Sequence, residues 1–384
     1  MAFVAASLPA QHLFDAAPGR ALRFQPSDRA VLAGDQDRKD LPCRVTPQEP
    51  HLGFDLKFTA GYVVQVQADS IAAGGDDLRV LFRVRPVSGP DRKPAFFRQT
   101  FPVAPASAEG GGRATFPGRF IVGPGQYEVD WLMRNRAGQV CSAHWTATAR
   151  LPPAVAGLAA APPPNHVAPF SESTFAEAPP IARASDRDGG LHISLLLNVA
   201  PLERDRFRLS GHEVGCIVGM LRSLHAEPRL GLFSLIAFNA YDRQLVYEVR
   251  GQPRLDFESL GDAIEETPGG VVDFDQLADP DGEKRFLEDV LTRSLSAGPR
   301  APDALVVIGQ KVDREARLEE GQFRPSTRPA VLHQFAFHRN PQSYPWTGAI
   351  EAALRPHGLV VSTISKAEDF GRALARMLSG FPGS

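Results

Sequence analysis

Residues 191–198 read LHISLLLN, and this stretch decides the fold of the second half of the chain. The run from Ile193 to Leu197 is almost entirely apolar, which is typical of a central strand buried on both faces. A helical pattern follows at residues 210–225, where apolar side chains recur every three or four positions. Strand and helix then alternate to the C-terminus. The sequence therefore predicts an α/β domain at residues 191–384 with a doubly wound, mostly parallel sheet.

One pair of strands departs from this alternation. Residues 231–238 and 244–249 are predicted to form a hairpin, because only a short turn separates them. Ser365 with Glu368 three residues later predicts a capping box at the start of the last helix. The remaining strands are expected at 303–309, 330–337 and 359–364, and the remaining helices at 283–297, 345–355 and 366–378.

The N-terminal half has a different pattern, in which apolar and polar side chains alternate. Tyr127, Val129 and Trp131 alternate with charged residues, and the pattern resumes after a turn at 135–138, so residues 126–149 are predicted to form a β-hairpin. The same alternation occurs at 54–58 and 78–84. Several such strands joined by Gly/Pro turns predict an all-β, sandwich-like domain at residues 41–150.

Two segments flank this β domain. Residues 1–40 are expected to form an irregular arm, whose first ten residues are either the remnant of a signal peptide or an ordinary N-terminus. Of the 40 residues at 151–190, 18 are Pro or Ala, which predicts a linker without a core of its own. The expected order is arm, β domain, linker and α/β domain.

The charge balance argues against nucleic acid as a partner. The chain has 42 Lys and Arg against 44 Asp and Glu, for a formal net charge of -2, and it shows no long run of one sign. A nucleic-acid footprint would need clustered basic charge. No apolar run reaches the roughly 20 residues that a membrane helix needs, so no membrane span is expected.

The three cysteines leave two readings open. Cys43 and Cys141 fall in the β domain, whereas Cys216 lies in a predicted helix of the second domain. A Cys43–Cys141 disulfide with one buried thiol would fit a secreted or periplasmic protein. Three reduced cysteines would fit a cytoplasmic one.

The order of elements after residue 191, with its early hairpin, resembles the von Willebrand factor type A family. That resemblance implies a divalent metal held by an Asp-x-Ser-x-Ser motif, a loop Thr and a later Asp. Here Asn198, Ala200 and Leu202 align with the motif, Val271 with the Thr and Gln310 with the Asp. A hard cation prefers carboxylate and hydroxyl oxygens. The resemblance therefore implies a degenerate metal-ion-dependent adhesion site that binds no metal.

Other chemistry finds little support in the sequence. His212 and Cys216 share a helix face at zinc-ligand spacing, but no second pair accompanies them. The turn after residue 198 lacks the glycines of a nucleotide site, and no G-x-S-x-G elbow occurs. The polar and aromatic loop at 338–346 would follow a strand at the ligand-binding edge of the sheet. Its candidate contact residues are Arg339, Asn340, Tyr344 and Trp346, beside Asn198 and Gln310.

We interpret the chain as a non-catalytic, metal-independent protein-binding or adhesion-type protein, exported by a bacterium and needing no cofactor. Its partner would be another protein or a surface macromolecule. Two alternatives remain: an enzyme of unrecognised type with a site between the two domains, and a structural module of a surface assembly. Fold alone does not distinguish them.

Overall fold

The computed structural model divides into two compact units. Unit 1 comprises residues 1–53, 57–151 and 162–173, and unit 2 comprises residues 54–56, 152–161 and 174–384. The structure describes residues 12–14, 25–34, 36–67, 70, 76–89, 92–103, 112–171, 173–178, 181, 190–203, 206–267, 279, 281–296, 300–312, 323–324, 327, 329–338 and 346–381.

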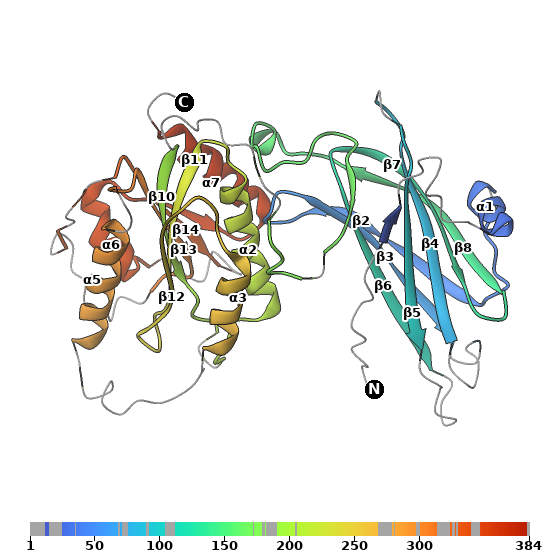
Figure 1. The fold of residues 1–384 in the computed structure, drawn as a ribbon, viewed down its shortest axis with the longest axis horizontal. Coiled ribbons are helices and arrows are strands. Elements are labelled where there is room, and N and C mark those ends of the chain that lie inside the picture. The colour runs from blue at the N-terminus through green and yellow to red at the C-terminus, as the bar shows by residue number, and fades with distance from the viewer. Residues whose placement is uncertain are drawn as a thin grey trace. The chain divides into compact units, whose positions relative to one another are not determined.

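Unit 1 contains two antiparallel sheets that share one core (Figure 1). One sheet has the order β1-β5-β4-β7-β8 and the other the order β2-β3-β6-β9. Alternate side chains of both sheets point into the core, which is rich in aromatic rings such as Tyr62, Phe82 and Trp131. This arrangement is consistent with the β-sandwich expected from the sequence. The strands are β1 (His12–Phe14), β2 (Cys43–Leu52), β3 (Phe58–Gln67), β4 (Asp76–Pro86), β5 (Ala95–Val103), β6 (Arg113–Val122), β7 (Gly125–Arg134), β8 (Val140–Ala149) and β9 (Val167–Pro169).

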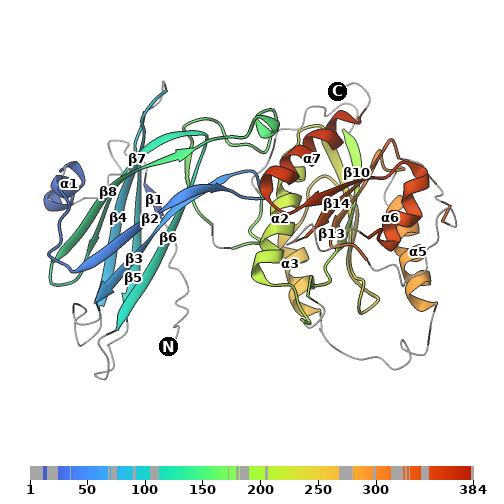
Figure 2. The same ribbon diagram turned by 180° about the vertical axis from the view of Figure 1, so that it is seen from behind.

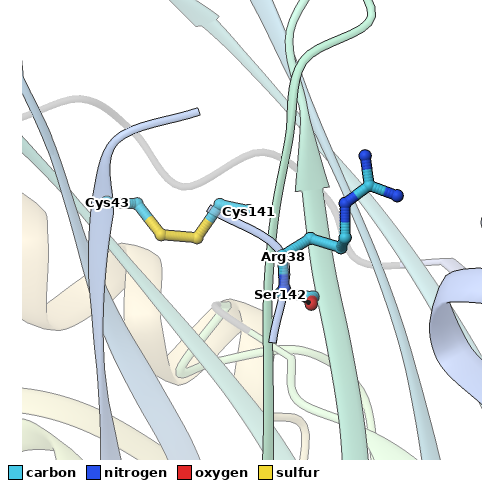
Figure 3. The surroundings of a disulfide bond; sticks show 4 residues. All are labelled: Arg38, Cys43, Cys141 and Ser142. Atoms are coloured by element: carbon cyan, nitrogen blue, oxygen red, sulfur yellow. Dashed lines mark hydrogen bonds between the residues drawn. A yellow bond between two sulfur atoms is a disulfide. The ribbon is translucent and has the colours of Figure 1, made fainter. Parts of the chain in front are cut away.

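A disulfide joins the two sheets of unit 1. Cys43 at the start of β2 is bonded to Cys141 in β8, 98 positions further along the sequence (Figure 3). Cys216 is a free, buried cysteine. The bridge and the single thiol follow the first of the two readings of the sequence.

Two segments that were expected to be irregular contain regular structure. Residues Pro26–Ala33 form a helix, α1, with Pro26 in its first turn, so the expectation of an irregular arm was wrong there. Within the Pro/Ala-rich stretch, β9 pairs with β6, and Pro153–Val155 form a short 3-10 helix, η2. Short elements of this kind depend on neighbours distant in sequence, which local composition does not reveal.

The β2–β3 turn also differs from expectation. Alternation at residues 54–58 predicted a strand, but β3 begins only at Phe58, and Leu56 has a left-handed backbone with φ 59°. The turn residues Phe54–Leu56 belong to unit 2, where the ring of Phe54 lies 5.7 Å from that of Phe337. The alternation pattern assigned these apolar side chains to the core of the β domain, but they belong to unit 2.

Unit 2 is built on a six-stranded sheet with the order β12-β11-β10-β13-β14-β15. Figure 2 labels β10, β13 and β14 of this sheet. The predicted central strand, β10, is buried from His192 onward and pairs in parallel with β11 and β13. The strands are β10 (Leu191–Asn198), β11 (Leu230–Asn239), β12 (Gln244–Gln252), β13 (Ala304–Gly309), β14 (Val331–Phe337) and β15 (Val360–Ile364). The described helices are α2 (Gly211–His225), α3 (Phe257–Glu266), α5 (Gly282–Leu295), α6 (Ala349–Leu354), η5 (Arg355–His357) and α7 (Ala367–Ser379).

The predicted fold class needs correction, because the described residues contain no clear doubly wound α/β domain. The sheet is mixed: β12 returns antiparallel to β11 after a turn of four residues, which is too short for a crossover. The described part of the connection from β13 to β14 contains no helix. Across both units the described chain is dominated by strands in three sheets. The alternation of predicted strands and helices after residue 191 overestimated how much of unit 2 is helical.

Candidate functional site

The carboxyl ends of four neighbouring strands define the candidate site. β11, β10, β13 and β14 run parallel in register, so the segments that follow them emerge at one edge of the sheet. We call this the carboxyl edge. Asn198 ends β10, Asn239 ends β11, and Gln310 and His338 directly follow β13 and β14. Open sheets commonly bind ligands at such an edge.

Asn198 and Gln310, two predicted site residues, lie together at this edge and bond to backbone groups. Asn198 is 1% exposed; its Nδ2 donates to the Gln310 carbonyl (3.1 Å), and its Oδ1 accepts from the Ala200 (3.1 Å) and Ala240 (3.4 Å) amides. Gln310 Nε2 donates to the Pro201 carbonyl at 2.7 Å. We call these two side chains the amide clasp. It joins the segments that follow β10, β11 and β13.

Gly309 allows the clasp to close. Its φ is 122°, a backbone conformation that L side chains rarely adopt. A Cβ at this position would lie 2.5 Å from the Asn198 carbonyl oxygen. A larger residue would therefore push β13 away from the end of β10.

A buried carboxylate holds both ends of the loop between β10 and α2. Glu213 Oε1 accepts from the Leu202 amide at 2.8 Å, and Oε2 accepts from the Ser210 amide at 2.6 Å. Ser210 is the N-cap of α2 and completes a capping box with Glu213, as expected for a helix beginning there. Burial alone would raise the pKa of Glu213, but the hydrogen bonds from Ser210 and Leu202 outweigh it and lower that pKa.

Trp346 contributes through its backbone to a second buried carboxylate. Lys311 Nζ lies 2.9 Å from Glu351 Oε2 and donates to the Trp346 carbonyl at 2.9 Å. Arg355 forms an ion pair with the other oxygen of Glu351. Burial would raise the pKa of Glu351, and the hydrogen bonds from Lys311 and Arg355 reverse that shift and lower it. The half-buried Trp346 therefore helps to seat the segment that leads into α6.

The rest of the predicted loop lies outside the described residues. This applies to Arg339, Asn340 and Tyr344, and also to Val271, the counterpart of the family's loop Thr. His338, the last described residue before that loop, is buried, and its pKa is lowered by burial and then by the nearby charge of Lys311.

The His212–Cys216 pair has contact geometry but little ligand character. Cys216 Sγ lies 3.6 Å from His212 Nε2. Burial, and then the negative charge of Glu213, raise the pKa of Cys216 to about 12, so its thiol stays protonated at neutral pH. A metal ligand must be a thiolate. Among the residues that the structure describes, no group of three His, Cys, Asp or Glu side chains could hold a metal ion.

Sequence reasoning missed the apolar side chains that the carboxyl edge exposes. Phe207, in the loop after β10, is 65% exposed. Tyr241, in the turn after β11, is 38% exposed, and Leu245, near the start of β12, is 39% exposed. We call these three residues the apolar triplet. Their signal in the sequence was an apolar residue flanked by charged or turn residues, as in Arg206-Phe207-Arg208.

Comparisons with known proteins do not assign a family. No family model and no curated protein matches the chain. Among solved structures, a β-glucosidase from Listeria innocua in complex with glucose is similar with a TM-score of 0.18 and 8% identity, over 29% of this chain and 17% of that one. A Bacteroides uniformis β-glucuronidase gives a TM-score of 0.19 and 10% identity, over 77% of this chain and 36% of that one. Likeness at these TM-scores supports no conclusion about fold or function.

The described helices also bear on membrane insertion. None of them is long and apolar enough to cross a membrane.

Proposed function

We propose that this chain is an exported, non-catalytic binding protein that holds a protein partner at the carboxyl edge of the six-stranded sheet without a metal ion. The observation that carries the proposal is the contrast at that edge between polar and apolar groups. The amide clasp and Glu213 bond to the chain's own backbone, whereas Phe207, Tyr241 and Leu245 face solvent.

The apolar triplet has the chemistry of a protein contact. Aromatic side chains are enriched at the centres of interfaces, where they bury large areas. Burying one such side chain fully contributes roughly 1.5–3 kcal/mol, so a partner that covers the triplet would gain several kcal/mol before the cost of association.

The loops that carry the triplet are held in place. Phe207 lies between Leu202 and Ser210, whose amides both donate to Glu213. The Tyr241 amide donates to Asn239 Oδ1 at 3.0 Å. A loop that is ordered before binding loses less conformational entropy on association. The polar network thus supports binding by fixing the exposed side chains.

The disulfide supports the proposed export. Disulfides persist in secreted and periplasmic proteins, whereas the cytosol keeps thiols reduced. Cys141 is fully buried and Cys43 is packed against the same core. This bridge would stabilise unit 1 in an oxidising compartment. A protein that binds its partner at a cell surface works in such a compartment.

Site-specific photocrosslinking in the native host tests the proposal. A photoreactive residue at position 207 or 241 should crosslink to one discrete protein. The matched control is position 360, because Val360 is 42% exposed but lies at the amino end of β15, at the opposite edge of the sheet.

The crosslinked partner is then purified and its affinity is measured. Phe207→Ala should weaken binding at least tenfold, as expected for the loss of a buried aromatic contact, and Val360→Ala should not. EDTA should leave the affinity unchanged. Equal crosslinking from positions 207 and 360, or equal affinity of both alanine variants, would refute the proposed surface.

A further inference from the structure

A groove in unit 1 has the features of a ligand site. Its volume is about 630 Å³, within the range of roughly 300–1,000 Å³ that small-molecule pockets occupy. It lies between α1, the segment at residues 36–41 and the β7–β8 hairpin; we call residues 36–41 the strap. The residues that matter to its chemistry are Ala30, Val31, Gln36, Arg38, Arg134 and Val140.

The helix that forms one wall is fixed by three contacts. Leu32 packs in a small core with Leu132 and Val140. Arg134 Nε donates to the buried carboxylate of Asp28 at 2.9 Å. Arg83 donates to the Leu32 carbonyl at 2.9 Å, which satisfies a carbonyl of the last helical turn. This eight-residue helix therefore has a defined position on β7 and β8.

The strap is fixed just as firmly. The Arg38 amide donates to Ser142 Oγ at 2.7 Å, and the Ser142 amide donates to the Arg38 carbonyl at 2.9 Å. The Leu41 amide donates to the Val140 carbonyl at 3.0 Å, and the disulfide joins the chain just beyond the strap to β8. Figure 3 shows the Arg38 side chain pointing away from the disulfide.

The groove lining carries positive charge over an apolar floor. Among the residues that the structure describes, Arg38 and Arg134 line it and no Asp or Glu does, while Ala30, Val31 and Val140 supply apolar surface. The carboxylates that pair with these two arginines, Asp28 and Asp40, do not line the groove. Asp28 pairs with Arg134 in a largely buried contact, and Asp40 pairs with Arg38 in an exposed one, with side-chain exposures of 43% and 53%.

The two ion pairs differ in how easily a ligand could replace them. An exposed ion pair contributes little free energy, so Arg38 can exchange Asp40 for another carboxylate at small cost. A guanidinium binds a carboxylate through two parallel hydrogen bonds. Arg134 is held by Asp28 and by the Gly138 carbonyl (2.9 Å), so it shapes the wall and is not free to move.

We propose that this groove binds a small molecule that has a carboxylate and an apolar body. Arg38 holds the carboxylate, and the floor of Ala30, Val31 and Val140 covers the apolar part. The site is independent of the protein-binding surface proposed for unit 2.

The probe for the test is N-acetylphenylalanine, with N-acetylphenylalaninamide as the uncharged match. Saturation-transfer NMR with the full chain measures the affinity of each. The acid should bind about threefold more tightly than the amide, because only the acid can pair with the Arg38 guanidinium and an exposed ion pair contributes little free energy. Arg38→Gln should remove that preference.

The matched control is Arg136→Gln. Arg136 lies in the β7–β8 hairpin, part of which lines the groove. Like Arg38 it forms an exposed ion pair, with Asp77, but it does not line the groove itself. Arg136→Gln should bind the acid as the native chain does. Equal binding of acid and amide, equal binding by both variants, or no saturation transfer from either probe would overturn the proposal. An unchanged melting temperature of Arg38→Gln separates loss of the ligand contact from unfolding.

Discussion

Replacing Asn198 with alanine should destabilise unit 2 by about 2–6 kcal/mol. The substitution removes the partner of the Gln310 carbonyl and of the Ala200 amide, at a position that is only 1% exposed. Leaving a buried polar group without a partner costs about 1–3 kcal/mol, and two such groups give the stated range. The bond to the Ala240 amide is long, at 3.4 Å, and adds little.

Far-ultraviolet circular dichroism during urea unfolding measures this loss. Of the described α-helices only α1 lies in unit 1, so the helical signal reports mainly on unit 2. Gln310→Ala serves as the graded control, because it removes only the bond to the Pro201 carbonyl and keeps its own carbonyl for Asn198. It should cost about 1–3 kcal/mol, because it leaves one buried carbonyl without its partner where Asn198→Ala leaves two buried groups. An Asn198→Ala loss no larger than the control's would show that the clasp does not hold the edge together.

Three further predictions concern the disulfide, a buried histidine and divalent cations. Cys43→Ser should destabilise unit 1 by about 4–5 kcal/mol in the chain-entropy account for a loop of roughly 100 residues, whereas Cys216→Ser should leave unit 1 unchanged in the same denaturation assay. Burial, followed by repulsion from Arg376, lowers the pKa of His333 to about 4, so unit 2 should lose stability as the pH falls from 6.5 to 4 and keep its full stability above 6.5. His333→Gln should flatten part of that pH dependence, and an unchanged profile would contradict the assignment. Millimolar Mg²⁺ or Mn²⁺ should not raise the melting temperature of unit 2, since only a ligand that prefers the native state does so; a rise abolished by Asn198→Ala would refute the metal-free interpretation.

The sequence predicted elements whose causes are local. Ile193 to Leu197 form a buried strand because an apolar run of that length needs cover on both faces. Ser210 begins α2 because its hydroxyl and Glu213 satisfy each other's backbone amides within four residues. The one capping box that the sequence predicted, Ser365 with Glu368, was misplaced. Lys366 is the N-cap of α7, and Asp369, rather than Glu368, accepts hydrogen bonds from Ser365.

Features that depend on distant partners could not be predicted. Only one apolar residue of α1, Leu32, is buried, so the helix has almost no amphipathic pattern. It exists where it does because Asp28 meets Arg134, 106 residues later in the chain. The strand β9 has three residues and is recognisable only through its pairing with β6. The groove of unit 1 is built from these same long-range contacts, so no motif pointed to it.

The sequence pointed to Asn198 and Gln310 but did not reveal that their amides bond to the chain's own backbone. Asn198 and Gln310 were predicted as site residues because they align with two carboxylates of the family that the sequence resembles, and the two amides do meet at one edge. A carboxylate only accepts hydrogen bonds, whereas Asn198 must donate to the Gln310 carbonyl and also accept from the Ala200 amide. An amide at this position is therefore what the backbone of three segments requires. Because the hydrogen bonds at this edge also fix the loops that expose Phe207 and Tyr241, an amide at position 198 would favour a rigid contact surface over an ion site.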